Sequence, residues 1–216
     1  MREYVAEFIA TFALVFIGAG AVAANVASNG ALGIVGIALA HGLVLMAMVF
    51  ALGHVSGAHA NPAVTIALFS AKKIDSSKAI GYIASQLLGA AVAGFLLIAF
   101  FSPSQGLGVP ALGQNTSFWQ GALLEAILTF FLVTVVFGVA VDKKGLNANA
   151  GLAIGLVLAF DILMGGTLTG AAMNPARAFG PAIASGQWAN QLAYWIGPIV
   201  GGLAAALAYD KALKSK

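Results

Sequence analysis

The sequence contains no cysteine, and this absence excludes two kinds of site. Disulfide bonds cannot form, and a metal ion cannot be held by thiolates. The three histidines are not accompanied by clustered carboxylates, so no metal site is expected. Cysteine usage therefore gives no information about the compartment.

Charged residues are also scarce. They make up 8% of the 216 residues, whereas 61% are hydrophobic. A soluble domain carries roughly 25% charged residues. We therefore expect an integral membrane protein. The apolar run that follows Tyr4 is long enough to cross a bilayer, which takes about 20 residues, and it lacks an early cleavage site, so we expect it to remain as the first span.

The few basic residues are placed selectively. Nine of the ten lie at the boundaries of apolar segments, and they are Arg2, Lys72, Lys73, Lys78, Lys143, Lys144, Lys211, Lys214 and Lys216. The positive-inside rule then predicts that both termini are cytoplasmic and that the number of crossings is even. The net charge of +3 thus indicates topology and requires no nucleic acid partner. We expect a multi-pass protein of the plasma membrane.

Six apolar segments are long enough to span a bilayer, and they lie near residues 5–26, 32–53, 79–101, 118–141, 149–166 and 190–209. Two shorter apolar segments, about 61–70 and 174–184, cannot cross and are predicted to be re-entrant half-helices. Each of the two begins at an Asn-Pro-Ala triplet.

The two halves of the chain resemble each other. Residues 6–16 align with residues 124–134, which places Glu7 on Glu125. Because each half has three crossings, the second copy must enter from the opposite side, as in an inverted repeat. The predicted fold is all-α and membrane-embedded: a single channel domain over 1–216, with repeats of about 1–105 and 115–216.

The two triplets predict the centre of a pore. They are Asn61-Pro62-Ala63 and Asn174-Pro175-Ala176. Asparagine is a good helix cap, and proline is well placed in a first helical turn. Two such starts meeting inside the membrane would direct two positive dipole ends and two amides at one point. That point would repel cations and orient a neutral solute.

With these features the sequence resembles the aquaporin family, the major intrinsic proteins, over essentially its full length. The resemblance implies a homotetramer with one pore in each protomer. It also implies passive passage of water or small uncharged solutes, without catalysis or cofactor. It further implies that Glu7 and Glu125 accept hydrogen bonds from the backbone of the two pore loops.

In this family four positions line the narrowest constriction, and they can be counted from the triplets. Twenty residues before Asn61 stands His41, and twelve before Asn174 stands Ile162. Three before and three after Asn174 stand Ala171 and Arg177. Arg177 is expected to supply donors and a barrier to cations. His59 is a further candidate for lining the pore, whereas His54 is expected to be structural.

The predicted filter is similar to that of plant vacuolar-type aquaporins, several of which combine His, Ile, a small residue and Arg. Highly water-selective bacterial members instead have Phe at the His41 position and His at the Ile162 position. The resemblance implies water as the main solute, with ammonia, urea or hydrogen peroxide as further candidates. One departure is Leu112, where some vacuolar-type relatives carry a His that repositions the filter arginine.

Glycerol facilitators are the main alternative. They place Asp after the filter Arg, a basic residue four positions further on, and Pro-Leu in the sixth span. This chain has Ala178 and Ala182, followed by Tyr194 and Trp195, which is the water-channel pattern. The filter also lacks an aromatic wedge for a carbon backbone. Water is therefore favoured over glycerol.

Two other classes remain open. An ion-coupled secondary transporter also uses inverted repeats, but its coupling site needs intramembrane acids, and the spans offer only Glu7, Glu125 and Asp161. A structural junction protein would need no open pore. If Ile162 faces the pore, Asp161 is expected to turn away from it, because adjacent helical positions point about 100° apart.

Overall fold

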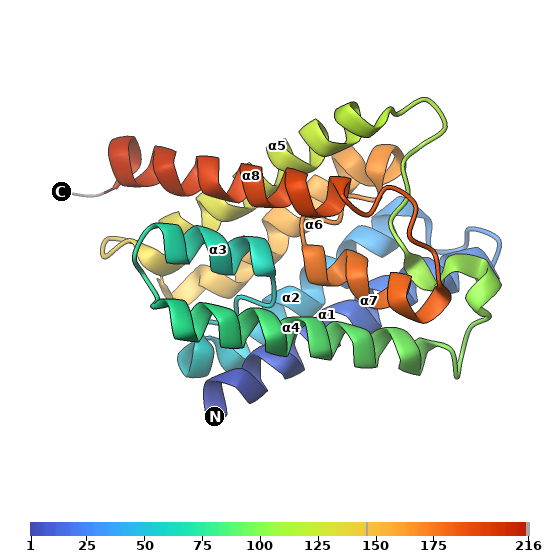
Figure 1. The fold of residues 1–216 in the computed structure, drawn as a ribbon, viewed down its shortest axis with the longest axis horizontal. Coiled ribbons are helices and arrows are strands. Elements are labelled where there is room, and N and C mark those ends of the chain that lie inside the picture. Colours follow the sequence, from blue (N-terminus) through green and yellow to red (C-terminus); the bar gives the residue numbers. More distant parts are fainter. Residues whose placement is uncertain (146, 215–216) are drawn as a thin grey trace.

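The computed structural model describes residues 1–145 and 147–214, so the predicted boundary residue Lys216 lies outside the described part. Those residues form helices joined by loops and turns, without a β-strand. The α-helices are α1 (Arg2–Ala27), α2 (Gly33–Ser56), α3 (Pro62–Ser70), α4 (Ser76–Leu97), α5 (Phe118–Val136), α6 (Ala150–Thr169), α7 (Pro175–Ser185) and α8 (Ala193–Ala208) (Figure 1).

Within the described residues, six helical segments are long and apolar enough to cross a membrane: α1, α2, α4 and α6, together with α5 extended to Val141 and α8 extended to Leu213. They correspond to the six predicted spans, and the predicted all-α membrane fold is confirmed. Some boundaries differ by a few residues. For example, α4 begins three residues earlier than the hydropathy indicates, because Asp75 caps it by accepting a hydrogen bond from the Lys78 backbone N–H at 2.8 Å.

The two short apolar segments form the half-helices α3 and α7. Asn61 caps α3 and Asn174 caps α7, each through its side-chain oxygen. In Figure 1 the half-helices lie end to end with their N-termini at the middle of the molecule, and α4 and α8 flank them on either side. Neither half-helix crosses the structure, as predicted for re-entrant segments.

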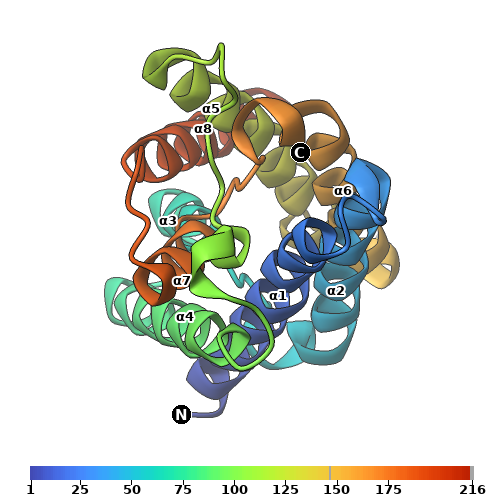
Figure 2. The ribbon, with the colours of Figure 1, turned by 90° about the vertical axis from the view of Figure 1, so that its right-hand side faces the viewer.

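The packing follows the inverted repeat. In the first half α1 packs against α2 and α4, and in the second half α5 packs against α6 and α8. Each half-helix also packs against a span of the other half: α7 lies against α4, and α3 lies against α8. Viewed along the long axis, α3 and α7 lie at one side of the molecule between α4 and α8, across from α2 and α6 (Figure 2). The two sequence repeats are therefore interlocked rather than stacked.

Close approach of the half-helix α7 to α4 depends on glycine. A Cβ atom at Gly94 would collide with the backbone carbonyl of Gly180, and one at Gly180 would collide with that of Ala90. Small residues allow this because helices in a membrane associate through close backbone packing. The contact fixes the depth at which α7, and with it Asn174, sits in the protein.

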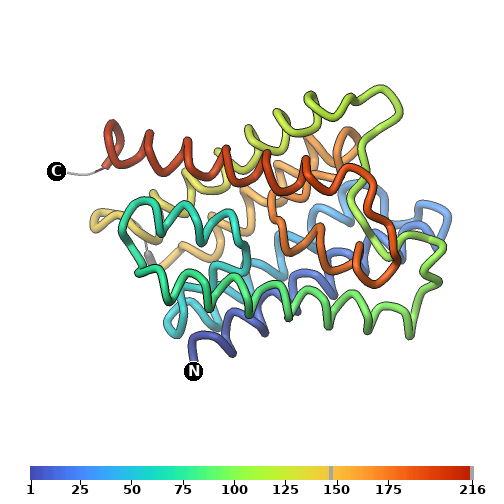
Figure 3. Tube along the Cα trace, viewed as in Figure 1, coloured from blue at the N-terminus to red at the C-terminus, as the bar shows by residue number. Residues whose placement is uncertain are grey.

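A long connection between α4 and α5 covers the end of the molecule that is remote from both termini. It contains the short helix η1 (Pro103–Gly108), which contacts α1 and α7. Figure 3 shows this segment folding back over the end of the bundle before the chain reaches α5. The last residue of η1, Gly108, reaches the functional site.

At the opposite end, α5 and α8 each finish in a π-helical turn. These turns are η2 (Phe137–Val141) and η4 (Tyr209–Leu213). The Tyr209 hydroxyl donates a hydrogen bond of 3.0 Å to the Asp142 carboxylate and so joins the two helix ends. Both chain termini lie at this end of the molecule (Figure 1).

Candidate functional site

The loops that lead into α3 and α7 have the same unusual backbone. Gly57 and Gly170 have φ of 90° and 82°, and each is followed by an alanine, Ala58 or Ala171, with φ of 46° or 43°. Non-glycine residues seldom adopt positive φ, and they do so where surrounding contacts hold them. The two copies therefore retain one loop geometry despite their different sequences.

Two buried carboxylates provide those contacts. Glu7 of α1 accepts hydrogen bonds from the backbone N–H groups of His59 at 2.9 Å and Ala60 at 2.8 Å. Glu125 of α5 accepts the equivalent bonds from Ala172 at 3.0 Å and Met173 at 2.6 Å. Both carboxylates are fully buried, and burial is tolerable because these donors replace water. Each half thus anchors its own pore loop.

A second set of bonds fixes the start of each loop. Ser56 and Thr169 donate their hydroxyls to Glu7 and Glu125, both at 2.7 Å. The backbone carbonyls of Ser56 and Thr169 accept hydrogen bonds from the hydroxyls of Tyr82 and Tyr194, at 2.8 Å and 2.7 Å. The hydrogen bond from Tyr194 gives a physical role to one of the residues that the sequence marked as water-channel type.

The two asparagine caps bridge the halves. The amide nitrogen of Asn61 donates to the Met173 carbonyl, and that of Asn174 donates to the Ala60 carbonyl, both at 2.8 Å. Their side-chain oxygens accept backbone N–H groups from the first turn of their own half-helices. An amide carries two N–H donors, so each asparagine keeps one for a solute. Both side chains line the central cavity.

Arg177 is buried near the outer end of this cavity, with 3% of its surface exposed. Its Nε–H donates to Nε2 of His41 at 3.3 Å, and its Nη1 donates to the Gly108 carbonyl at 2.6 Å. His41 in turn contacts the Ile37 carbonyl through Nδ1 at 2.9 Å, which assigns the tautomer with its proton on Nδ1. Three of the five guanidinium N–H groups remain for a solute.

Two glycines make this arrangement possible. A Cβ atom at Gly18 of α1 would overlap the His41 ring. Gly108 has φ of 76°, and a Cβ there would collide with the backbone of Ala19. Neither glycine was singled out from the sequence. Gly108 has a local signal, because it closes a Gly-Leu-Gly turn before a proline, whereas Gly18 has none within its apolar helix.

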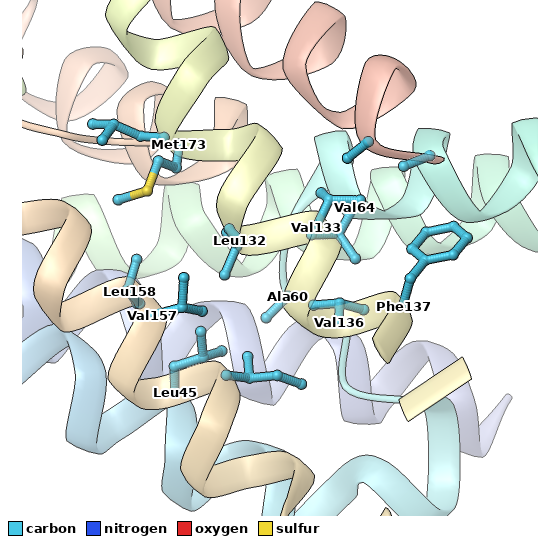
Figure 4. Packing of buried hydrophobic residues seen from close by; sticks show 14 of the residues in the cluster. Leu45, Ala60, Val64, Leu132, Val133, Val136, Phe137, Val157, Leu158 and Met173 are labelled. Carbon is cyan, nitrogen blue, oxygen red and sulfur yellow. The ribbon is translucent and has the colours of Figure 1, made fainter. Parts of the chain in front are cut away.

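The cavity runs from His41 and Arg177 to the end of the molecule that carries both termini. The loop of residues 57–59 lines one part of its wall, and Lys73 lies at the mouth. Apolar side chains line the remainder, among them Leu14, Leu45, Val64, Leu68, Leu132, Val136, Ile154 and Leu158. Figure 4 shows several of these side chains grouped between the helices.

His59 is one of the cavity-lining residues. Its Nδ1 lies 3.1 Å from the Thr65 hydroxyl, and its ring packs edge-on against Tyr82 with ring centroids 5.0 Å apart. The structure therefore brings together His41, His59, both asparagines and Arg177 around one cavity.

Ile162 and Ala171 are placed differently. Both are almost completely buried, with 1% and 2% of their surface exposed, and they belong to the main apolar cluster rather than to the described lining of the cavity. Met173, from the same loop, is also part of this cluster. The structure thus joins His41 to Arg177 by a hydrogen bond, whereas the side chains of Ile162 and Ala171 pack in the apolar cluster and only the Ala171 backbone N–H makes a described polar contact, with the Thr169 hydroxyl at 3.1 Å.

Asp161 is buried, with 2% of its surface exposed. One turn further on, Gly165 faces Leu124 and Leu128 of α5, so Asp161 lies on or near the α5 side of α6 and outside the described cavity lining. Its Oδ2 atom has no hydrogen-bond partner among the described residues. Neither Asp161 nor Ile162 belongs to the described cavity lining, so the expectation that the two residues point to different sides stays a prediction.

The remaining marker residues surround α7. Ala178 and Ala182 are fully buried, and Ala178 packs with Ala172 and Tyr194 against Leu112. Trp195 is partly exposed. Leu112 also lies against Gly121 of α5, where a Cβ would overlap it. No group of three His, Cys, Asp or Glu side chains that could hold a metal ion occurs within the described chain.

The reasoning from sequence missed Tyr82 and Gln86. Gln86 of α4 donates to Glu7 at 2.7 Å and to Thr65 at 3.0 Å, so it belongs to the network that holds the first loop. Both residues are polar and fall inside an apolar span, which was the available signal.

Comparison with known proteins agrees with this geometry. The profile of the major intrinsic protein family matches residues 1–209. Aquaporin TIP4-4 of Zea mays is 42% identical, over 97% of this chain and 86% of that protein. Aquaporin AqpM of Methanothermobacter thermautotrophicus is 40% identical, over 97% of this chain and 96% of that protein.

A solved structure is also similar. The X-ray structure of the aquaglyceroporin from Plasmodium falciparum superposes with a TM-score of 0.86 at 30% identity, and the match covers 98% of this chain and 96% of the other. The family profile and these relatives extend over nearly the entire sequence. The chain therefore belongs to the major intrinsic protein family and is a passive membrane channel for water and small solutes rather than an enzyme.

Proposed function

We propose that water is the principal solute and that His41, Ile162, Ala171 and Arg177 form the selectivity filter. The observation that carries this proposal is the guanidinium of Arg177, buried beside the cavity and held by His41 and the Gly108 carbonyl. Because the Arg177 guanidinium is held in place, it can hydrogen-bond to a passing water molecule with little rearrangement of its side chain. The apolar wall opposite offers few competing partners, so water is bound weakly enough to leave.

Exclusion of cations follows from the same elements. Arg177 places a positive charge beside the path, and the N-termini of α3 and α7 direct two positive dipole ends at the asparagines. The free amide N–H of each asparagine would hold the oxygen of a passing water. A water that accepts both bonds cannot also accept a proton from its neighbour, which interrupts a proton-conducting chain.

The alternative is a glycerol and urea facilitator. The fold permits it, since one solved structure that superposes on this chain is an aquaglyceroporin. Against it, none of the four proposed filter positions carries a Trp or Phe side chain to pack against a carbon backbone. We therefore rank glycerol below water, and we keep ammonia, urea and hydrogen peroxide as smaller secondary solutes.

An ion-coupled transporter is the less favoured class. Both Glu7 and Glu125 use their carboxylates to hold the pore loops, so neither is available as a coupling site. Asp161 lies outside the cavity lining. Coupling would therefore lack an acid on the path of the solute.

We further propose that residues 1–216 form a single channel domain, which assembles as a homotetramer in the plasma membrane with both termini cytoplasmic. Large apolar side chains are exposed along the spans, including Val35, Leu43, Leu123 and Leu156. They would face either lipid or a second copy of the chain. Crosslinking of the detergent-purified protein would separate a tetramer from a monomer.

The deciding experiment is stopped-flow light scattering of proteoliposomes under gradients of an impermeant solute, glycerol, urea and ammonium. Water permeability well above that of empty vesicles, with a low activation energy and slower glycerol flux, is expected. Glycerol flux equal to water flux would instead support the facilitator, and uptake driven by a proton gradient would support the transporter.

Two variants test the filter in the same vesicles. In Arg177→Ala the barrier to cations is removed, so proton leakage should rise several-fold while water still passes. In His41→Phe an aromatic ring replaces the acceptor of Arg177, and urea and ammonia flux should fall relative to water. Unchanged solute ratios in both variants would place the filter elsewhere.

A further inference from the structure

A second pocket lies at the end of the molecule that carries both termini. Three segments enclose it: the turn after α3 with Lys73, the end of α5 with the loop that follows, and the end of α8. It lies outside the site described above, although Lys73 and Val141 line both this pocket and the pore cavity. We name it the terminal pocket, lined by Lys73, Phe137, Val141, Asp142, Lys143, Lys144, Tyr209, Asp210 and Lys214.

The charge of the terminal pocket is positive. Four lysines and two aspartates line it. Both aspartates are already engaged, since Asp210 pairs with Lys214 at 3.2 Å and Asp142 accepts the Tyr209 hydroxyl at 3.0 Å. The four lysines outnumber the two aspartates, so the lining keeps an excess of positive charge for an incoming anion.

The remaining lysines are exposed. Lys73, Lys143 and Lys144 reach solvent, and the ion pairs among the described residues involve only Lys78 and Lys214. Lys143 and Lys144 are consecutive in a turn, which is fixed where the Lys144 backbone N–H donates to the Asp142 carboxylate at 2.9 Å. The turn thus presents several ammonium groups beside a shared opening.

The other side of the terminal pocket is apolar. Phe137 and Val141 form part of its lining, and the Phe137 ring packs against Tyr209 with ring centroids 5.6 Å apart. These residues belong to the last turns of two membrane spans, Phe118–Val141 and Ala193–Leu213. The pocket therefore lies at the ends of two membrane spans, the level at which lipid headgroups are expected, and its lining combines lysines with apolar residues.

We propose that the terminal pocket binds the phosphate group of an anionic membrane lipid. A phosphate diester carries the charge that the lysines complement, and its acyl chains match the apolar wall. A soluble phosphate would satisfy the lysines but not Phe137 and Val141. The two π-helical turns that frame the pocket, η2 and η4, are tied by the Tyr209 to Asp142 hydrogen bond, so the site is built from fixed backbone.

The test compares two double variants that remove the same charge from the same end of the protein. Lys143→Gln/Lys144→Gln alters the terminal pocket, whereas Lys72→Gln/Lys211→Gln removes two lysines that do not line it. Native mass spectrometry of the intact detergent-purified protein, titrated with phosphatidylglycerol or with phosphatidylcholine, measures binding. Water permeability in phosphatidylcholine vesicles checks that both variants are folded.

We expect the pocket variant to bind phosphatidylglycerol roughly tenfold more weakly than the parent, and the control variant to stay within about threefold. Phosphatidylcholine binding should be the same in all three proteins. Equal losses in both variants would overturn the proposal, because they would indicate general attraction to a basic surface. Displacement of the lipid by an equal concentration of soluble glycerol phosphate would also overturn it, by showing that the acyl chains contribute nothing.

Discussion

At the scale of single residues, the position of His41 depends on the lack of a side chain at Gly18. Gly18 of α1 leaves the space that the imidazole ring fills, and the ring in turn accepts the hydrogen bond from Arg177. The glycine itself touches neither the solute path nor the arginine. In the proposed filter, selectivity would thus depend partly on a glycine that no filter motif contains.

This dependence gives a test in Gly18→Ala. The added methyl group should displace the ring, release Arg177 from Nε2 and lower water permeability several-fold. In a His41→Ala background the same substitution meets no ring, so its effect on water permeability should largely disappear. Gly53→Ala is the matched control, because its nearest neighbour lies at an ordinary 3.8 Å. Equal effects of Gly18→Ala in both backgrounds would exclude a steric mechanism.

Asp161 is a second residue whose effect on the stability of the protein can be tested. Its buried Oδ2 has no partner among the described atoms, and an unsatisfied buried polar group costs about 1–3 kcal/mol. Asp161→Leu has a similar shape and no polar atom, so it should raise the unfolding temperature measured by tryptophan fluorescence in detergent. Asp161→Asn separates charge from hydrogen bonding.

Water permeability of Asp161→Leu should stay within about twofold of the parent, because the residue lies outside the cavity lining. A lower unfolding temperature would reveal a partner for this carboxylate, such as a buried water or a neighbouring subunit.

At the scale of elements, each pore loop is attached to a span by one carboxylate. Glu125→Gln should disrupt the second loop, since an amide puts an NH₂ group among donors that need an acceptor. We expect a loss of about 2–4 kcal/mol in the free energy of unfolding and a severe loss of water permeability. Thermal unfolding and stopped-flow assays measure both.

The matched control is Glu3→Gln, which changes a carboxylate whose side chain is 41% exposed and pairs with Lys78. It should cost less than about 1 kcal/mol. If Glu125→Gln proved as mild as Glu3→Gln, the loop would have to be held mainly by its other contacts, such as the hydrogen bond from Tyr194.

The elements themselves were largely predictable. Span lengths and the two helix starts follow from local chemistry, namely uninterrupted apolar runs and the Asn-Pro pairs. Helix ends were less predictable, because a cap such as Asp75 shifts a boundary without changing hydropathy. A contact that depends on shape, such as Gly18 against His41, carries no sequence signal because any small residue fits an apolar pattern.

At the scale of the whole molecule, the basic residues predict which end faces the cytoplasm. The absence of cysteine makes this measurable, since a single introduced thiol is the only target for a maleimide. Ser104 is exposed in the connection between α4 and α5, and Lys144 is exposed at the end with both termini. Ser104→Cys should react with an impermeant maleimide in intact cells, and Lys144→Cys only after permeabilisation. The opposite labelling pattern would reverse the topology.

The crossed asparagine bonds also constrain how the protein is made. Asn61 lies 112 positions from Met173, and Asn174 lies 114 positions from Ala60, so neither bond can close until the ribosome has produced most of the chain. During membrane insertion the first re-entrant loop is therefore held by Glu7 while the Asn61 amide still lacks its partner. The growing chain would pass through a state in which only the first half of the pore has formed and is exposed to the bilayer. Insertion of α7 would then complete the pore.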